Sequence, residues 1–541
     1  MTLTRRQFLQ TLGLAGAGVS LSALTACRRI DQPQPVTALD TPEGQTGEVI
    51  SAFLAHPVAG SFDPLTATSP TIVAMWRHSG ESLTDWDPAS GELAPSLAAN
   101  LPRQIGPTEW EVRIRDGAAF STGEAVTADD VAWNINRAAH SGDASPLGLF
   151  YGYIQSAQAK GDRTVRILLH RPHQLLAEDL TGLIITAQDA DFDSHPVGSG
   201  PFTLSMADPS HIIMEKNPRY NGPWPARVDR LEWTATSEQQ GRVEALKTGQ
   251  VNAIQTTPID AFAPGGALAG SGFDTTDNPS LGQLYILFNC STHPFDIAAN
   301  RQALLTALDA PIIRTHAAGG RGEIARAVVP ESYAGFHPAA KAYAAGGTAV
   351  ASAAIRAAGL AGTRLTLRCS DDPLSRIAAN LVGDAWQAAG VKCTVSPIVR
   401  VPGERRTANQ ILFEEIDQGG DFDVVLGFTD PSIFGRTALF AARWFFLSEK
   451  WMAARARVKG TPEYNTAHAA IIAATEAASE ARQQATAEAL DAIADLAALY
   501  PLVFVNNATT WQRDQLDNFG ASLSTMLDFR GVARTNVGKN K

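Results

Sequence analysis

Two strand-like runs that are apolar at every position limit the folds open to this chain. They cover residues 284–288 and 502–505, and a strand that is apolar on both faces belongs inside a sheet covered by helices. Residues 364–369, 373–389 and 391–395 read as strand, helix and strand with a short parallel connection. The sequence therefore predicts an α/β fold.

The length predicts more than one lobe. The chain has 541 residues, whereas a single hydrophobic core stops growing beyond about 250–300 residues. A chain that begins and ends in one lobe crosses to the other an even number of times, and the runs near Leu284 and Leu502 are our candidates for these crossings. Before the second crossing we expect a long helical stretch that reaches Tyr500 and ends at Pro501.

Composition excludes two broad classes of protein. Apolar residues make up 45% and charged residues 18% of the chain, and the net charge is −11. No basic excess is present to follow a phosphate backbone, so we expect no nucleic-acid partner. No uninterrupted apolar run reaches the 18 residues of an ordinary membrane span.

The N-terminus reads as an export and anchoring signal. Arg5 and Arg6 precede an apolar stretch over 12–26, which resembles a twin-arginine export signal. Leu-Thr-Ala-Cys27 resembles a bacterial lipobox. The resemblance implies removal of residues 1–26, lipidation of Cys27, and a flexible, lipid-anchored tether over 27–47 that holds the body at the cell membrane, facing the periplasm or exterior.

Three further cysteines, Cys290, Cys369 and Cys393, cannot all pair with one another. Cys369 and Cys393 lie on two strands that flank one predicted helix, so a bridge between them is conceivable. Buried free thiols are favoured, because twin-arginine export carries proteins that have already folded in a reducing cytoplasm.

Several segments, in order, resemble the peptide/nickel type of bacterial extracellular solute-binding proteins, which serve dipeptide and oligopeptide ABC importers. The resemblance runs in register from about residue 50 to 310 and more loosely to 510. The segments that carry it are 61–65 (SFDPL), 81–83 (ESL), 110–131 with its TADDV end, 197–202 (VGSGPF), 217–220 (NPRY), 288–289 (FN), 294–295 (PF) and 301–304 (RQAL).

This resemblance implies a two-lobed periplasmic-binding-protein fold of the venus-flytrap type. Lobe I would comprise residues 48–283 plus 506–541, with an extra inserted subdomain at about 85–195. Lobe II would comprise 284–505. Ligand would be trapped between the lobes by hinge closure.

The family's cleft strand commonly reads G-W-x-x-D-x-x-D-P, and the matching residues here are Gly427, Phe428, Thr429 and Asp430, followed by Pro431. Phe replaces Trp, the segment is shorter, and one acid remains. The resemblance implies backbone pairing with a peptide and an ammonium held by Asp430. Asp430 also ends a buried strand, where open α/β sheets place ligands. The alternative is that Asp430 caps a helix with Pro431 at its first position.

Two other residues are candidate ligand contacts. Trp444, followed by Phe445 and Phe446, forms either the floor of a ligand pocket or part of the core. Asn289, just past an apolar strand, either hydrogen-bonds ligand from the hinge or caps a turn.

Charged and histidine clusters elsewhere suggest no further site. Arg400, Arg405 and Arg406 could meet a ligand carboxylate, but a solvated loop is the better interpretation. His170 and His173 approach metal-ligand spacing, yet a proline separates them and no Cys, Asp or Glu cluster is near. We therefore expect no metal and no cofactor.

Together these observations predict a lipid-anchored, monomeric receptor that binds peptides and delivers them to the permease and ATPase subunits of an ABC importer. No G-x-S-x-G, P-loop or H-E-x-x-H motif is found, so we expect no enzyme. The alternatives are the same fold with a non-peptide solute (a nickel chelate, an oligosaccharide or haem) and an exported α/β hydrolase.

Overall fold

The structure of the chain is a computed structural model that describes residues 48–535, apart from 89, 193–195, 237, 263–264, 271, 279, 340–347, 401–405 and 520–526. The predicted export signal with Arg5 and Arg6, the lipidated Cys27 and the tether over 27–47 lie outside the described residues. In the described part, no helix is long and apolar enough to cross a membrane.

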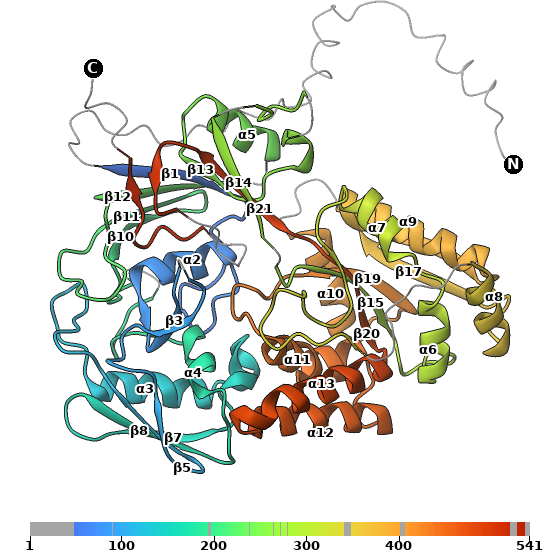
Figure 1. Cartoon of the computed structure of the whole chain (residues 1–541), viewed down its shortest axis with the longest axis horizontal. Helices are drawn as coiled ribbons and strands as arrows, with labels where there is room; N and C mark the ends of the chain where they lie inside the picture. The colour runs from blue at the N-terminus through green and yellow to red at the C-terminus, as the bar shows by residue number, and fades with distance from the viewer. Residues whose placement is uncertain are drawn as a thin grey trace, which may run out of the picture. The chain divides into compact units, whose positions relative to one another are not determined.

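One sheet is built from both ends of the described chain. β1 pairs in parallel with its two neighbours, and β21, from the last tenth of the chain, lies between two strands from the middle of the chain. Helix α2 (Pro70–Ser79) packs on this sheet, and α5 (Gln239–Lys247) leads into one of its strands (Figure 1). The strand order is β10 (Phe202–Ala207), β11 (His211–Lys216), β12 (Arg230–Ala235), β1 (Val49–Leu54), β13 (Ala253–Ile254), β21 (Asn507–Gln512) and β14 (Phe273–Asn278).

A second, six-stranded sheet contains both apolar runs. Every residue of β15 and β20 is buried, as predicted for strands covered on both faces. Its order is β16 (Glu323–Ile324), β20 (Leu499–Phe504), β15 (Gln283–Phe288), β19 (Val424–Thr429), β17 (Arg364–Ser370) and β18 (Lys392–Ile398).

Helices cover this second sheet (Figure 1). The predicted strand–helix–strand unit is confirmed: β17 and β18 pair in parallel, and α9 packs on both. The helices are α6 (Ala298–Leu305), α7 (Ala310–Ala317), α8 (Thr348–Ala357), α9 (Pro373–Ala388), α10 (Ala408–Asp417), α11 (Ala438–Phe446), α12 (Pro462–Glu476) and α13 (Ser479–Leu496).

The residues between α2 and β10 form most of another core, which also includes Leu281, Val329, Tyr333 and the start of α11. Helix α3 (Ala128–Ala139) packs on a four-stranded antiparallel sheet, and a capping box begins it, since Thr127 Oγ1 accepts from Asp130 N–H at 3.2 Å. The sheet order is β5 (Arg103–Gly106), β6 (Glu109–Arg113), β8 (Thr164–Leu169) and β7 (Ile154–Ala159). Shorter elements around it are β2 (Glu81–Ser82), β3 (Thr84–Trp86), β4 (Leu93–Pro95), α4 (Leu176–Asp179) and β9 (Ile184–Ile185).

The chain passes between the two large sheets just before β15 and just after β20. The two passing segments are joined by hydrogen bonds: Val505 N–H donates to Gly282 C=O at 2.7 Å, and Ser280 Oγ donates to Val505 C=O at 3.1 Å. We refer to these as the crossing segments. This arrangement is compatible with the predicted lobe boundaries at 283 and 506, which stay a prediction.

The predicted helical stretch to Tyr500 is wrong at its end. Helix α13 stops at Leu496 because Ala497 adopts a left-handed conformation with φ 49°. Two residues later the chain enters β20, where Tyr500 and Pro501 pair with β15. The apolar character of 499–504 fits an interior strand as well as a helix, so the pattern alone did not reveal the boundary.

The three described cysteines are free and buried, as favoured by the sequence. Cys369 lies opposite Pro397 and Cys393 opposite Leu365, so the two thiols are four positions apart on parallel strands. Burial raises the pKa of each of the three thiols to about 11.

We therefore expect Cys290, Cys369 and Cys393 to resist alkylation at pH 8 in the folded protein and to react once it unfolds, because the thiolate is the reactive form. Mass spectrometry after labelling with and without urea measures this. A bridged Cys369–Cys393 peptide, or labelling of either residue in the folded state, would contradict the expectation.

Candidate functional site

The predicted cleft strand is β19, which lies between β15 and β17. Its pairing with β17 ends at Leu426, so the residues that follow pair with β15 alone. Gly427 lies opposite Tyr285, and a Cβ at this glycine would come 2.5 Å from Tyr285 Oη. Thr429 Oγ1 in turn lies 3.1 Å from the same hydroxyl. Gly427 therefore leaves room for the ring of Tyr285, and Thr429 hydrogen-bonds the hydroxyl of that ring.

Asp430 stabilises a turn rather than a helix. Its Oδ1 accepts a hydrogen bond from Ser432 N–H at 2.9 Å, the Asx-turn pattern. Residues 431–435 are not helical, and α11 begins at Ala438 with Thr437 as its cap, so the alternative of a helix cap at Asp430 is wrong. Phe428, just before it, is partly buried, and its C=O accepts from Asn409 Nδ2 at 3.2 Å.

Asn289 is not brought together with Asp430. Gln283 pairs with Thr429, and Phe288 pairs with Val424, so Asn289 lies at the opposite end of β15. Its amide is fully buried, donates to Phe422 C=O at 2.8 Å and accepts from Ser291 Oγ at 2.7 Å. These contacts are those of a turn-capping residue.

Trp444 belongs to an aromatic stack at one side of a cavity. Its ring centroid lies 5.4 Å from that of Phe434, 5.8 Å from that of Phe440 and 6.3 Å from that of Phe150. Phe445 and Phe446 point into the core of the second sheet. The indole N–H of Trp444 is buried and finds no acceptor among the described residues.

A narrow cavity of about 20 Å³ lies beside this stack, which is room for about one water molecule. Two distant parts of the chain line it, which we call the 86–179 wall and the 434–443 wall. The first contributes Trp86, Leu147, Phe150, Tyr151, Glu178 and Asp179, and the second contributes Phe434, Gly435, Arg436, Thr437, Phe440 and Arg443. None of the predicted ligand contacts lines it directly, and Trp444 adjoins it through the stack.

A buried ion pair joins the two walls. Arg443 donates to both oxygens of Asp179, at 2.7 and 2.9 Å, and His173 Nε2–H donates to Asp179 at 2.8 Å. Both charged side chains are at most 4% exposed. Burial raises the pKa of Asp179, but Arg443 and His173 outweigh it and hold this pKa below its usual value. Burial lowers the pKa of His173 to about 4, so His173 is neutral at pH 7.

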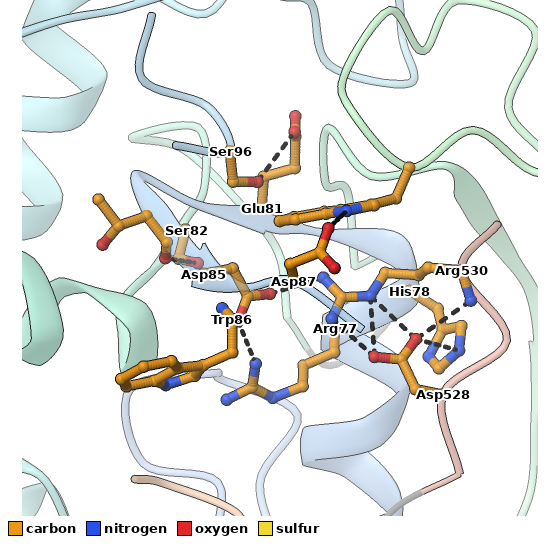
Figure 2. A network of polar contacts seen from close by, with 12 residues as sticks. Arg77, His78, Glu81, Ser82, Asp85, Trp86, Asp87, Ser96, Asp528 and Arg530 are labelled. Carbon is orange, nitrogen blue, oxygen red and sulfur yellow. Dashed lines mark hydrogen bonds and ion pairs between the residues drawn. The ribbon is translucent and has the colours of Figure 1, made fainter. Parts of the chain in front are cut away.

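A second network of charges joins α2, β3 and the C-terminal segment that carries Asp528 and Arg530 (Figure 2). Asp85 lies between two guanidinium groups, with Arg77 and Arg530 each 2.6 Å from one of its oxygens. Arg530 also binds Asp528 at 2.7 Å. Arg77 Nη2 lies 3.4 Å from Ile433 C=O, so the network reaches the 431–435 turn.

His78 completes this second network as a neutral group. Its Nε2 accepts from Phe529 N–H at 2.9 Å, so its proton is on Nδ1, which donates to Ala74 C=O at 2.7 Å. Burial, with only partial compensation by Asp528, lowers the pKa of His78 to about 4. The imidazole thus fixes the C-terminal segment against α2.

Two charged groups of the cavity have no ionic partner among the described residues. Arg436, on the 434–443 wall, makes no hydrogen bond or ion pair there. Glu178, on the other wall, accepts a hydrogen bond from the side chain of Thr437 but forms no salt bridge. No group of three His, Cys, Asp or Glu side chains in the described part of the chain could hold a metal ion.

Comparison with known proteins identifies the family. The family model of bacterial extracellular solute-binding proteins, family 5 middle, matches residues 92–445, more than half of the chain. The chain belongs to this family. The predicted family is thus confirmed.

Solved structures confirm the two-lobed α/β fold of family 5. A dipeptide-binding protein from Pseudoalteromonas sp. SM9913, in complex with Met-Leu, is 17% identical, with a TM-score of 0.72 over 90% of this chain and 100% of that one. NikA from Brucella suis, in complex with Fe(III)-EDTA, is 19% identical, with a TM-score of 0.73 and 90% and 100% coverage. The oligopeptide-binding AppA from Bacillus subtilis, with a nonapeptide, is 17% identical, with a TM-score of 0.72 and 91% and 100% coverage.

Sequence relatives cover less of the chain. The glutathione-binding protein GsiB of Escherichia coli O1:K1 / APEC is 27% identical over 236 residues. The match covers 42% of this chain and 45% of GsiB, so it spans less than half the length of that relative.

We expect Gly427→Ala to lower the free energy of unfolding by about 1–3 kcal/mol, because the new Cβ would overlap the ring of Tyr285. Urea unfolding measures the change. Gly241→Ala is the matched control: it lies in helix α5 with only Glu238 Cβ, at 3.7 Å, near the added methyl. Equal stability of the two variants would contradict the packing role of Gly427.

We also expect stability to fall as the pH is lowered from about 6.5 to about 4. His78 and His173 stay neutral in the folded protein while the unfolded chain takes up protons on both, which costs about 3 kcal/mol for each group across this window. Glu178 contributes to the pH dependence with the opposite sign. Burial and Asp179 raise its pKa to about 7 in the folded protein, so its proton binds to the folded state first and stabilises it as the pH falls. Urea midpoints at pH 4.5, 5.5 and 6.5 measure the slope.

His78→Gln isolates one of these contributions. The variant is expected to show a shallower pH dependence than the parent, whereas His293→Gln, at an exposed position, leaves the slope unchanged. An unaltered slope in His78→Gln would show that the imidazole is not neutral in the folded state.

Proposed function

We propose that this protein captures a peptide-class solute in the cavity between the 86–179 and 434–443 walls and delivers it to the permease and ATPase of an ABC importer. One observation carries the proposal: in a chain of this family, a narrow cavity lined by aromatic and charged side chains lies between two parts of the chain that are some 250 residues apart. Aromatic rings supply apolar contact area there, and a few polar groups set orientation.

The two walls belong to different parts of the fold, as capture of a solute by closure requires. The 86–179 wall belongs to the residues inserted between α2 and β10, and the 434–443 wall follows β19 of the six-stranded sheet. The Asp179–Arg443 pair holds the two walls together, and Arg77 of α2 contacts Ile433, just before the 434–443 wall. Movement about the crossing segments separates the walls and admits the solute.

The remaining predictions form part of the same proposal. Phe428, Asp430 and Trp444 are proposed to contact ligand at the margin of the cavity, with Gly427 and Thr429 contributing through their backbone. Asn289 is left out, because it lies at the far end of β15. We propose a monomer that is exported through Arg5 and Arg6, anchored through Cys27 at the cell membrane, and without catalytic activity.

Native mass spectrometry of the protein purified without denaturation tests this function. We expect a co-purifying small molecule whose mass corresponds to a short peptide, and calorimetry with that peptide should give one site per chain. A nickel chelate, an oligosaccharide or haem in its place would overturn the peptide assignment and support the alternative solutes.

The same preparation tests the remaining alternative of an exported hydrolase. The added peptide should be recovered intact after prolonged incubation with the protein, since no catalytic motif is found in the sequence. Turnover of the peptide would overturn the binding-protein function.

A further inference from the structure

The segment between α2 and β10 and the helices of the second sheet meet in a closely packed junction beside the narrow cavity. The ring of Phe150 stacks on that of Phe440, with centroids 4.8 Å apart, and the guanidinium carbon of Arg443 lies 4.5 Å from the centroid of Phe150. Gln174 N–H donates to Thr475 C=O at 3.0 Å. We call these contacts, with the ion pair that joins the walls, the junction. They connect parts of the chain that are far apart in sequence, so they exist only while the two parts are together.

Two neighbouring carboxylates of α4 face the junction, and one guanidinium group binds one of them. Asp179 accepts both hydrogen bonds of Arg443, at 2.7 and 2.9 Å. Glu178 accepts a hydrogen bond from the side chain of Thr437 and forms no salt bridge among the described residues. Because the cavity beside it has room for about one water molecule, Glu178 does not recover the hydration that it loses there. An enclosed carboxylate next to another one favours its protonated, neutral form.

Glu178 is the group at the junction whose charge changes near neutral pH. Burial and the neighbouring Asp179 raise the pKa of Glu178 to about 7. Asp179 stays ionised, because its pKa lies below its usual value, and His173 stays neutral, because its pKa is about 4. The other charged or titratable groups around them keep one state at neutral pH: the guanidinium groups of Arg443, Arg482 and Arg436 stay charged, and the buried phenols of Tyr151 and Tyr153, whose pKa values are raised by burial, stay neutral.

Separation of the walls returns Glu178 to water, where a glutamic acid has its ordinary pKa of about 4.3. The pKa of Glu178 is thus higher in the closed form than in the open form, so the closed form holds a proton that the open form releases. Closure gains free energy from this difference as the pH falls from about 7 towards about 4.5, and the gain is lost as the pH rises through about 7.

Building on the function proposed above, we propose that closure of the two walls takes up one proton at the Glu178 carboxylate and that opening returns it to the solvent. The proton comes from a hydronium ion or a buffer acid, the carboxylate becomes a neutral carboxylic acid, and no other bond changes. The proton is then a second ligand of the closed form, beside the solute. Capture of the solute is favoured in a mildly acidic medium, and release in a neutral or alkaline one.

Hydrogen exchange of the solute-free protein tests this coupling without knowledge of the solute. Gln174 N–H is bonded across the junction, so its protection factor reports the ratio of closed to open molecules. After removal of any bound solute by dialysis, exchange at Gln174 is followed by mass spectrometry at pH 7.5, 6.5 and 5.5 and corrected for the intrinsic rate. We expect the protection factor to rise by about twentyfold from pH 7.5 to pH 5.5, as follows from the closed and open pKa values of Glu178.

Two variants and a reference amide assign the effect. Glutamine resembles the protonated acid, so Glu178→Gln should keep a high protection factor at Gln174 that does not depend on pH. Glu124→Gln is the matched control, because Glu124 belongs to the same part of the chain but is exposed, and it should rise as the parent does. The amide of Ile286, inside the buried strand β15, reports global unfolding and separates it from opening of the junction.

Three results would overturn the inference. The first is a constant protection factor at Gln174 over pH 5.5–7.5 in the parent. The second is the same rise in Glu178→Gln as in the parent, which would place the proton elsewhere. The third is equal protection of Gln174 and Ile286, which would show that the walls do not separate without global unfolding.

The fate of the proposed function is read separately. The first two results reject the proton coupling alone, because native mass spectrometry of the bound solute does not depend on the pH response. The third also rejects capture by closure. A non-peptide solute would reject the peptide assignment and leave the proton coupling unchanged, since the exchange experiment contains no solute.

Discussion

The structure depends on the contact between its two crossing segments. Val505 N–H and Gly282 C=O are 2.7 Å apart, and this bond holds side by side the only two stretches of described backbone that pass between the large sheets. The end of β19 reaches the same place, since Asp430 Oδ2 and the ring of Phe428 both approach Gly282. Gly282 thus connects the crossing segments with the end of β19, which leads through the turn at 431–435 into one wall of the cavity.

The charged side chains around the cavity are of two kinds, those bound in ion pairs and those that are not. Asp85 and Asp179 are each bound by guanidinium groups with short hydrogen bonds, and such satisfied pairs fix segments that are far apart in sequence. Arg436 and Glu178 form no ion pair of this kind among the described residues, although Glu178 is next to Asp179 in the chain.

Local patterns predicted local structure well. The strand–helix–strand unit over 364–395 and the strand at 284–288 depend on residues close in sequence, so their signals are complete within a short window. The residues that line the cavity differ in this respect. Glu178 and Arg436 carry no motif, because the two walls to which they belong are some 250 residues apart in sequence, and the resemblance to the family pointed only to the neighbourhood of Arg436 through Asp430. Asn289 lies at the other end of β15 from Asp430, and an apolar strand does not reveal which of its ends faces a cleft.

The insertion of β21 between β13 and β14 has a consequence for the order in which the protein is made. The six-stranded sheet uses one continuous stretch of chain, from Gln283 to Phe504, and can assemble as soon as that stretch has left the ribosome. The seven-stranded sheet has to wait for residues 507–512, and His78 for Phe529. The part translated first is thus completed last, and its unpaired strand edges stay exposed through most of synthesis, when chaperone protection matters most.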